Sequence, residues 1–294
     1  MTTNTMGQLL LDEPLSDYTT WRVGGMAKRL YKPLHVLDLV SFLKQLPKDE
    51  PLLWLGLGSN SLIRDSGFAG TVIVTQGALK NIELLDTHIV KVEAGVSCAS
   101  MARFCARNQL KDAEFLAGIP GTMGGALRMN AGCHNGETWN FVESVQTMTR
   151  DGEIRTRDAR EFEISYRHVK GLMPDEWFIS ATCRLPLGNK ETSLDTIKQL
   201  LERRANTQPT NEYNCGSVFR NPEGDYAARL IESCGLKGHM IGGAQVSLKH
   251  ANFIINHEGR ASALDIETLI SHVHQTVLKQ TGHDLMREVH ILGE

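Results

Sequence analysis

Two glycine-rich segments constrain this chain more than any other feature of its sequence. The first, Gly56–Ser61 (GLGSNS), follows an apolar run that predicts a buried strand. Glycines at the end of a strand let the backbone approach a ligand closely, and free N–H groups there can face phosphate oxygens. The segment is not a G-x-G-x-x-G dinucleotide motif, because Ser61 stands where the third glycine belongs and no helix is predicted to follow. An ordinary strand-ending turn is the alternative.

The second segment, Gly118–Gly125 (GIPGTMGG), contains four glycines and a proline, and Asn130-Ala131-Gly132 extends its run of small residues. Small side chains let a planar or pyrophosphate group lie on the main chain, and Thr122 can add a hydroxyl donor. A tight packing corner between domains is the alternative. We interpret the segment as a second ligand-binding loop.

Helices and strands are predicted to alternate around these loops. Leu185–Asn189 breaks both patterns and is the best candidate for a domain boundary, placed at 187/188. The predicted strands are Lys28–Tyr31, Leu52–Leu57, Thr71–Val74, Ile82–Leu85, Ile89–Val92, Val142–Thr149, Glu153–Thr156, Trp177–Arg184, Ala251–Asn256 and Glu288–Leu292. The predicted helices are Val36–Leu46, Ser97–Asn108 with Ser97 as N-cap, Leu194–Asn206, Tyr226–Cys234 and Ala263–Thr281.

Composition excludes several classes of function. The formal net charge is -3 over 294 residues, so we expect neither nucleic acid nor an acidic membrane as a partner. Six scattered cysteines without a C-x-x-C pair predict free thiols in a reducing, cytoplasmic setting and no metal site. We find no stretch of about 18 apolar residues, so no membrane span is expected.

Three polar residues are candidates for chemistry, although each has an ordinary alternative. Ser217 follows a glycine outside any G-x-S-x-G elbow, which argues against a hydrolase nucleophile and allows a simple turn hydroxyl. Arg167 is predicted to end a polar strand, where it could equally be a surface ion-pair partner. Glu288 precedes a short strand and would be solvated by default.

Taken together, the motifs closely resemble those of the UDP-N-acetylenolpyruvoylglucosamine reductase family. The resemblance covers nearly the whole chain in the expected order. The matching motifs are Thr20-Trp21-Arg22-Val23-Gly24-Gly25, Gly56–Asn60, Gly118–Ala126, Asn130-Ala131-Gly132, Tyr166-Arg167, Gly216–Pro222, Gly242–Gln245 and Arg287-Glu288-Val289.

The resemblance implies an α+β protein with a vanillyl-alcohol-oxidase-type FAD-binding region over residues 1–187 and a smaller α+β substrate domain over residues 188–294. The FAD-binding region would comprise two α/β subdomains, about 1–78 and 79–187. The implied reaction is the NADPH-dependent reduction, through FAD, of a UDP-sugar enolpyruvyl ether in cytoplasmic peptidoglycan synthesis. The implied FAD-binding residues are Gly56, Leu57, Gly58, Ser59, Asn60, Ser61, Gly118, Ile119, Pro120, Gly121, Thr122, Gly124, Gly125, Ala126, Asn130, Ala131 and Gly132.

The resemblance also implies roles for the three polar residues. Ser217 matches a proton donor, and Arg167 and Glu288 match its catalytic companions. The chain resembles the short form of the family, which lacks an insertion bearing a tyrosine that closes over the substrate. Arg220, Asn221 and Gln245 are therefore candidates for contacts with the UDP-sugar. We expect a monomer that uses no metal.

Two alternatives are weighed against this interpretation. An oxidase of the same FAD fold acting on a hydroxy acid or alditol would share the glycine loops and lack the contexts of Ser217 and Glu288. A flavin- or nucleotide-sugar-binding module without catalysis would be plausible had Arg167, Ser217 or Glu288 been lost. The presence of all three favours the reductase.

Overall fold

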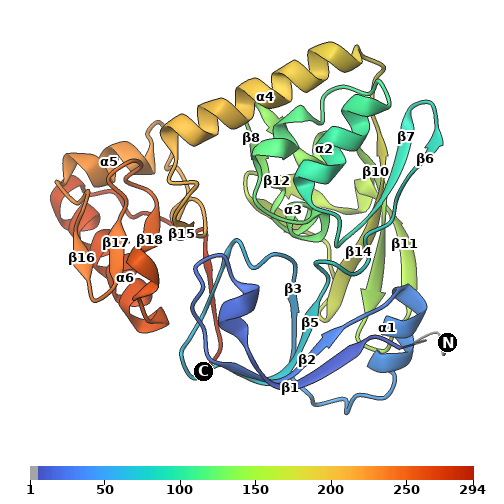
Figure 1. The fold of residues 1–294 in the computed structure, drawn as a ribbon, viewed down its shortest axis with the longest axis horizontal. Helices are drawn as coiled ribbons and strands as arrows, with labels where there is room; N and C mark the ends of the chain where they lie inside the picture. The colour runs from blue at the N-terminus through green and yellow to red at the C-terminus, as the bar shows by residue number, and fades with distance from the viewer. Residues whose placement is uncertain (1–5) are drawn as a thin grey trace. The chain divides into compact units, whose positions relative to one another are not determined.

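The computed structural model describes residues 6–294, which divide into two compact units (Figure 1). Unit 1 comprises Arg29–Gly56, Gly70–Glu202 and the N-terminal segment that ends at Leu10. Unit 2 comprises Leu11–Lys28, Leu57–Ala69 and Arg203–Glu294. The division falls inside the first glycine-rich segment, so Gly56 belongs to unit 1 and the rest of that segment to unit 2.

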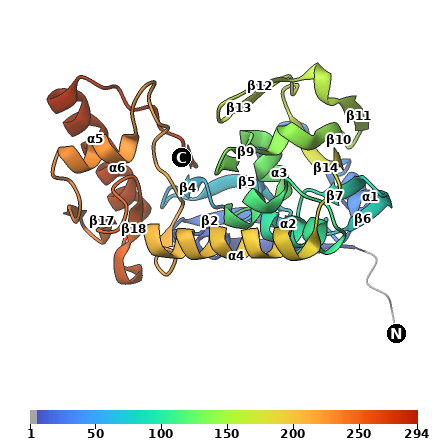
Figure 2. The same cartoon turned by 90° about the horizontal axis from the view of Figure 1, so that it is seen from above.

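The largest sheet of unit 1 has five antiparallel strands in the order β11-β10-β14-β7-β6. Its strands are β6 (Ile82–Asp86), β7 (Ile89–Glu93), β10 (Val142–Thr149), β11 (Ile154–Asp158) and β14 (Glu176–Arg184). Figure 2 shows α2 (Cys98–Arg107) and α3 (Met123–Met129) beside this sheet. Helix α3 packs on β14 and β7, and the apolar side chains of Val90, Met101 and Leu127 share one core. This core supports the second glycine-rich segment.

A four-stranded sheet in the order β1-β2-β5-β3 contributes a second core, with α1 (Val36–Leu43) packed on it through Leu39 and Leu43. Its strands are β1 (Gln8–Pro14), β2 (Met26–Lys32), β3 (Leu52–Leu55) and β5 (Phe68–Val74), with β3 and β5 parallel. Two short hairpins complete unit 1. They are β8 (Gly132–Cys133) with β9 (Gly136–Glu137), and β12 (Glu163–Ser165) with β13 (His168–Lys170).

Unit 2 is built on an antiparallel sheet in the order β15-β18-β17-β16, against which α6 (Ala263–Thr281) packs. The strands are β15 (Tyr213–Asn214), β16 (Met240–Ile241), β17 (Ala244–Val246) and β18 (Ile254–Asn256), and α5 (Ala227–Ser233) packs on α6. A separate parallel pair joins β4 (Ser61–Ile63) to β19 (His290–Leu292). Trp21, fully buried, anchors the N-terminal part of unit 2 by donating from Nε1 to the carbonyl oxygen of Ile254 at 2.7 Å.

The remaining helices are short or connect these parts. Helix α4 (Lys190–Thr207) contains the division between the units at Glu202/Arg203. The domain boundary expected at 187/188 precedes this helix and stays a prediction. The 3₁₀ helices are Leu15–Tyr18, Glu114–Gly118, Thr138–Phe141, Ala159–Glu161 and His257–Gly259.

Most long elements were predicted at or near their observed positions. The α6 helix has the predicted bounds, and the side chain of Ser97 caps α2 by accepting from the N–H of Ser100. The second glycine-rich segment was wrongly expected to be loop throughout, because Met123–Met129 is α-helical. Close packing accounts for the difference. A Cβ on Gly124 would lie 3.0 Å from that of Ala94, so the helix can approach Ala94 only with glycine there, despite glycine's low helix propensity.

Arg167 was also misplaced by the sequence pattern. It lies in the turn between β12 and β13 with φ of +53°, not at the end of a strand. Two short strands separated by two residues give too few alternations for the pattern to resolve a hairpin.

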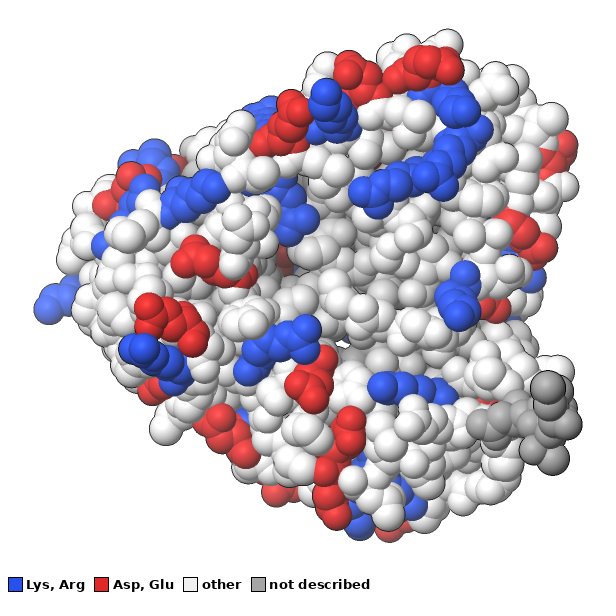
Figure 3. All heavy atoms as spheres, in the orientation of Figure 1, with Lys and Arg blue, Asp and Glu red and all other residues white. Residues whose placement is uncertain are grey.

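The surface and the thiols agree with the composition. Lys and Arg are interspersed with Asp and Glu over the face drawn in Figure 3. None of the six cysteines, which all lie within residues 6–294, forms a disulfide. None of the helices within residues 6–294 is both long and apolar enough to cross a bilayer.

Candidate active site

Unit 1 holds the second glycine-rich segment, which leads into the first turn of α3. Thr122 is the N-cap residue of α3, yet its side chain makes no capping hydrogen bond, and only 2% of the residue is exposed. Within residues 6–294, its Oγ1 atom is buried and has no hydrogen-bond partner. A buried hydroxyl without a partner is destabilising unless a ligand completes it. Thr122 therefore fits direct contact with a bound group.

Gly56 and Gly125 shape the space around Thr122. A Cβ on Gly56 would collide with Oγ1 of Thr122, so any other residue at position 56 would displace that hydroxyl or cover it. Gly125 is exposed, and a Cβ there would meet nothing within 4 Å. The main chain is thus closely packed on one side of Thr122 and open at the first turn of α3, which suits a group lying against the backbone.

Arg167 is attached to the end of this same segment. Its Nη2 atom donates to the carbonyl oxygen of Gly132 at 2.5 Å, and Nη1 donates to that of Asn130 at 3.3 Å. The guanidinium also lies 5.0 Å from the ring centroid of Tyr166. Arg167 is half-buried. Unit 1 therefore brings together two of the motifs predicted from the sequence, one for the cofactor and one for chemistry.

Asn130 makes this connection rigid. It ends α3 in the left-handed conformation with φ of 42°, and it is fully buried. Its Nδ2 atom donates to Glu137 Oε2 at 2.9 Å and to the carbonyl oxygen of Ser165 at 3.3 Å, while Oδ1 accepts from the N–H of Trp139 at 3.2 Å. One side chain thereby ties the end of α3 to the strand that leads into Arg167.

Unit 2 holds the remainder of the first glycine-rich segment. Gly58 has φ of +63°, and a Cβ there would collide with the carbonyl oxygen of Tyr18. The thiol of Cys215 faces the carbonyl oxygens of Gly58 at 3.5 Å and Ser61 at 3.6 Å. Burial raises the pKa of Cys215 to about 12, so the thiol stays protonated and can donate to these carbonyls. Cys215 thus stabilises the segment through the carbonyl oxygens of Gly58 and Ser61.

Ser217 and Glu288 lie on neighbouring strands of backbone in the same unit. The N–H of Glu288 donates to the carbonyl oxygen of Val218, the residue after Ser217, at 2.8 Å. Asn60, in the first glycine-rich segment, contacts Glu288, because its Nδ2 atom donates to the carbonyl oxygen of Glu288 at 3.2 Å. Ser217 and Glu288 are each half-buried. Unit 2 therefore gathers the predicted proton donor, its acidic companion and the end of the first segment.

Asn252 fixes the backbone beside Ser217 and was not predicted as a site residue. Its Oδ1 accepts from the N–H of Phe219 at 3.0 Å and its Nδ2 donates to the carbonyl oxygen of the same residue at 2.8 Å. Its own carbonyl oxygen accepts from the N–H of Val218 at 2.9 Å. Asn252 lies in the turn before β18, although the sequence placed it in an apolar strand, and a lone asparagine there gives no pattern for this role. Only its burial among apolar neighbours could have suggested it.

The three residues proposed for substrate contacts have different surroundings. Nε of Arg220 is buried and has no hydrogen-bond partner within residues 6–294. Asn221 Oδ1 accepts from the N–H of Ala227 at 3.1 Å at the start of α5, and Gln245 Nε2 donates to the carbonyl oxygen of Gly238 at 3.4 Å. Arg220 is thus the candidate whose donor is still available. Over the same residues, no group of three His, Cys, Asp or Glu side chains could hold a metal ion.

Comparison with known proteins identifies the family. Residues 27–157 match an FAD-binding domain model, and residues 208–292 match the C-terminal domain model of UDP-N-acetylenolpyruvoylglucosamine reductase. A reductase of that name from Legionella pneumophila (strain Paris) is 69% identical over 292 residues, covering 99% of this chain and 96% of its own. The chain belongs to the UDP-N-acetylenolpyruvoylglucosamine reductase family.

Other members of the family extend this result. The Methylococcus capsulatus reductase is 55% identical over 289 residues, covering 98% of this chain and 94% of its own. The crystal structure of the Thermus caldophilus enzyme superimposes with a TM-score of 0.82 at 31% identity, covering 98% of this chain and 99% of that one. The predicted family, fold class and FAD cofactor are confirmed.

The chain is accordingly an FAD-dependent oxidoreductase. It reduces UDP-N-acetylglucosamine enolpyruvate with NADPH in peptidoglycan precursor synthesis. The observations at Thr122, Gly56 and Gly125 independently fit a bound group at the second segment. The oxidase and the non-catalytic module are therefore not favoured.

Proposed function

We propose that Arg167, Ser217 and Glu288 carry out the substrate half of this reaction, and that the two glycine-rich segments hold FAD. FAD, when bound and reduced by NADPH, supplies the hydride that reaches the enolpyruvyl methylene carbon. The unpartnered Oγ1 of Thr122 and the open first turn of α3 support the second segment as part of the binding site. Gly56–Ser61 are included because their motif matches that of the family.

Arg167 stabilises the negative charge that develops when hydride reaches the methylene carbon. That charge spreads over the adjacent carbon and its carboxylate as an enolate. A guanidinium is permanently charged and planar, so it matches a carboxylate at two points. The carbonyl oxygens of Asn130 and Gly132, which accept from Arg167, orient the fork before substrate arrives. Preorganised charge of this kind is usually the largest contribution to such a step.

Ser217 donates the proton that completes the new stereocentre. A serine hydroxyl is a weak acid, so it can act only beside a strong base such as the enolate carbon. The backbone that presents it is fixed on both sides, by Asn214 Oδ1 accepting from the N–H of Gly216 at 3.0 Å and by Asn252 accepting from Val218. Glu288, held beside this backbone through its own N–H, orients the hydroxyl and the substrate carboxylate.

Arg220 is proposed to bind the pyrophosphate of the UDP-sugar. Its buried Nε without a partner within residues 6–294 supports this role, because a buried N–H donor of a charged group gains most from an anionic acceptor. Asn221 and Gln245 are proposed as weaker polar contacts, since each side chain already has a backbone partner.

The decisive experiment separates the two half-reactions of Ser217→Ala. Anaerobic stopped-flow absorbance should show flavin bleaching by NADPH at the parent rate, because Ser217 takes no part in it. Re-oxidation by the enolpyruvyl UDP-sugar should slow by about 100- to 10,000-fold, the usual contribution of a positioned proton donor. Ser271→Ala, an exposed serine on α6, is the matched control and should leave both rates unchanged. Re-oxidation of Ser217→Ala at the parent rate would refute the assignment.

The setting of the enzyme is also proposed. Six free thiols, four of them buried, support a reducing cytoplasm. Each unit has its own apolar core, which supports function as a monomer. Light scattering of the purified holoenzyme measures the mass, and a value of one 32.6 kDa chain is expected.

A further inference from the structure

The turn that carries Arg167 lies within a long excursion between two strands of the unit 1 sheet. The chain leaves β11 at Asp158, forms the β12–β13 hairpin and returns at Glu176, the first residue of β14. The hairpin itself has only three residues in each strand. Such a short pair is not stable alone, so its placement depends on what holds its base.

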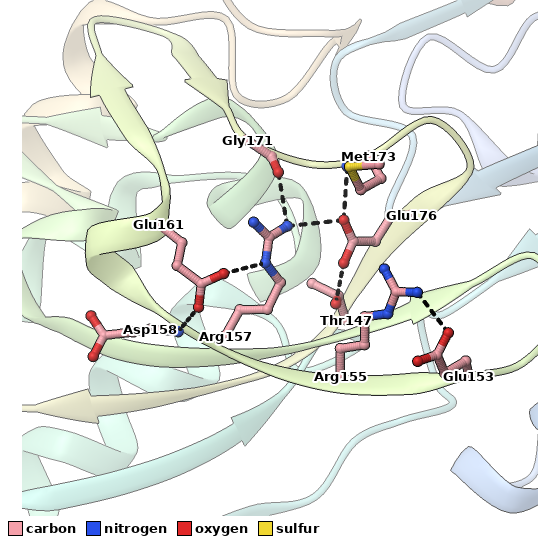
Figure 4. Close-up of polar contacts among 9 residues, drawn as sticks. All are labelled: Thr147, Glu153, Arg155, Arg157, Asp158, Glu161, Gly171, Met173 and Glu176. Atoms are coloured by element: carbon pink, nitrogen blue, oxygen red, sulfur yellow. Dashed lines mark hydrogen bonds and ion pairs between the residues drawn. The ribbon is translucent and has the colours of Figure 1, made fainter.

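Arg157 holds both sides of that base. Figure 4 shows its guanidinium between the outgoing and the returning chain. Nε donates to Glu161 Oε2 at 3.0 Å on the outgoing side, and Nη1 donates to the carbonyl oxygen of Gly171 at 2.8 Å on the returning side. The guanidinium carbon also lies 4.4 Å from the ring centroid of Phe162. A planar fork with several donors can bridge two chain segments in this way.

Glu176 anchors Arg157 to the sheet. Nη1 of Arg157 lies 3.0 Å from Glu176 Oε2, and the side chain of Glu176 has no exposed surface whereas that of Arg157 is 15% exposed. The carboxylate also accepts from the N–H of Met173 at 2.8 Å and from Thr147 Oγ1 at 2.5 Å (Figure 4). Four partners therefore surround this buried ion pair. Two acceptors, Glu161 and Gly171, bind Arg157, and two donors, Met173 and Thr147, bind Glu176, an arrangement that has one geometry.

We propose that Arg157, held by Glu176, is a positioning residue that sets the place of Arg167 for the reaction. This inference rests on the proposed role of Arg167. The far end of the hairpin is held by Asn130, through Ser165 and through the guanidinium of Arg167 itself. The tip is held by these two hydrogen bonds of 3.3 Å and by the 2.5 Å bond from Arg167 Nη2 to the carbonyl oxygen of Gly132, and the base held by Arg157 fixes the direction in which the hairpin leaves the sheet.

Arg155 supplies a matched control on the same strand. It lies two residues before Arg157 and forms an ion pair with exposed Glu153 at 2.7 Å (Figure 4). The side chains of Arg155 and Glu153 are 43% and 59% exposed. Substitution of Arg155 removes the same charge from the same strand without removing a hydrogen bond at the base of the hairpin.

The test compares Arg157→Lys, Arg157→Met and Arg155→Met as FAD-loaded enzymes in single-turnover experiments. Flavin reduction by NADPH should be unchanged in all three. Re-oxidation by substrate should slow about 10- to 100-fold in both Arg157 variants, because a displacement near 1 Å of a catalytic group has effects of this size. Lysine keeps the charge opposite Glu176 but cannot bridge Glu161 and Gly171 together. Parent-like re-oxidation in Arg157→Lys and Arg157→Met would overturn the proposal.

A second variant keeps the test independent of folding. Arg157→Met/Glu176→Met removes both buried charges, an exchange that proteins often tolerate. It should retain FAD and the parent melting temperature, yet lose re-oxidation rate like Arg157→Met. Limited trypsin digestion gives a readout without turnover. Cleavage after exposed Arg160 and Lys170 should accelerate in the Arg157 variants and not in Arg155→Met. Unchanged cleavage in the Arg157 variants would count against the proposal.

A double-mutant cycle distinguishes failure of this inference from failure of the proposed function. If Arg157 acts through Arg167, then Arg157→Met should slow re-oxidation no further in an Arg167→Ala background. Additive slowing would show that Arg157 acts elsewhere and would overturn the inference. If Arg167→Ala alone leaves re-oxidation unchanged, the proposed role of Arg167 is wrong instead.

Discussion

Gly58 offers the sharpest test of how the first glycine-rich segment is built. Ala at this position should destabilise unit 2 in two ways. A left-handed backbone costs an L-residue about 1 kcal/mol. In addition, the new Cβ would collide with the carbonyl oxygen of Tyr18 and lie 2.9 Å from Cα of Thr19, both of them backbone atoms. Overpacking against atoms that cannot rotate away costs about 2 kcal/mol more. Gly58→Ala should therefore lose about 3 kcal/mol.

Gly235→Ala isolates the first of these contributions. Gly235 lies in the same unit with φ of +70°, is exposed, and a Cβ there would meet nothing within 4 Å. Hydrogen exchange of the α6 amides, followed by mass spectrometry, reports the opening free energy of unit 2. Exchange should accelerate roughly 5-fold in Gly235→Ala and on the order of 100-fold in Gly58→Ala. Equal acceleration in the two variants would refute the argument from close approach.

Two further predictions concern titratable groups. Under native conditions at pH 8, iodoacetamide should label the half-buried Cys133 and Cys234. It should spare the four buried cysteines, because burial raises the pKa of their thiols; these are Cys98, Cys105, Cys183 and Cys215. Peptide mass mapping measures the labelling, and early labelling of Cys215 would contradict the prediction. Burial also lowers the pKa of His250 below its ordinary value of 6.5, so the unfolded chain binds more protons and stability should fall as the pH drops below about 6.5. Urea unfolding at pH 7.5 and 5.5 should show this loss, and His250→Asn should reduce it; an unchanged pH dependence in that variant would show that other groups cause it.

The fold was predictable where a single helix or strand is long enough to show its apolar periodicity in its own sequence. The 19-residue α6 has several turns of apolar periodicity and a serine N-cap, and its bounds were predicted residue for residue. The seven-residue α3 was missed because Gly124 and Gly125 lower helix propensity, and the contact with Ala94 that outweighs this cost is distant in sequence.

The candidate site was also predictable only in part. Ser217, Arg167 and Glu288 could be named from their motifs, because the motifs are contiguous. Asn130 was named only as an FAD contact, and Asn252 and Arg157 were not named, since all three bond to backbone carbonyls or to partners in other segments. Such contacts leave no periodicity in the sequence. The sequence around an asparagine or a strand arginine does not indicate which hydrogen bond its side chain makes.

The pairing of β4 with β19 has a consequence for the order in which the protein is made. Asn60, which donates to the carbonyl oxygen of Glu288, precedes it by 228 residues, and β19 begins at His290, just after Val289. At about 5–20 residues per second, the ribosome needs on the order of 10–50 s to cover that distance. Throughout this interval the segment Leu57–Ser61 has no C-terminal strand beside it, and unit 1 is completed during it, when Glu202 is added. Binding of FAD should therefore be among the last steps in the synthesis and folding of this enzyme.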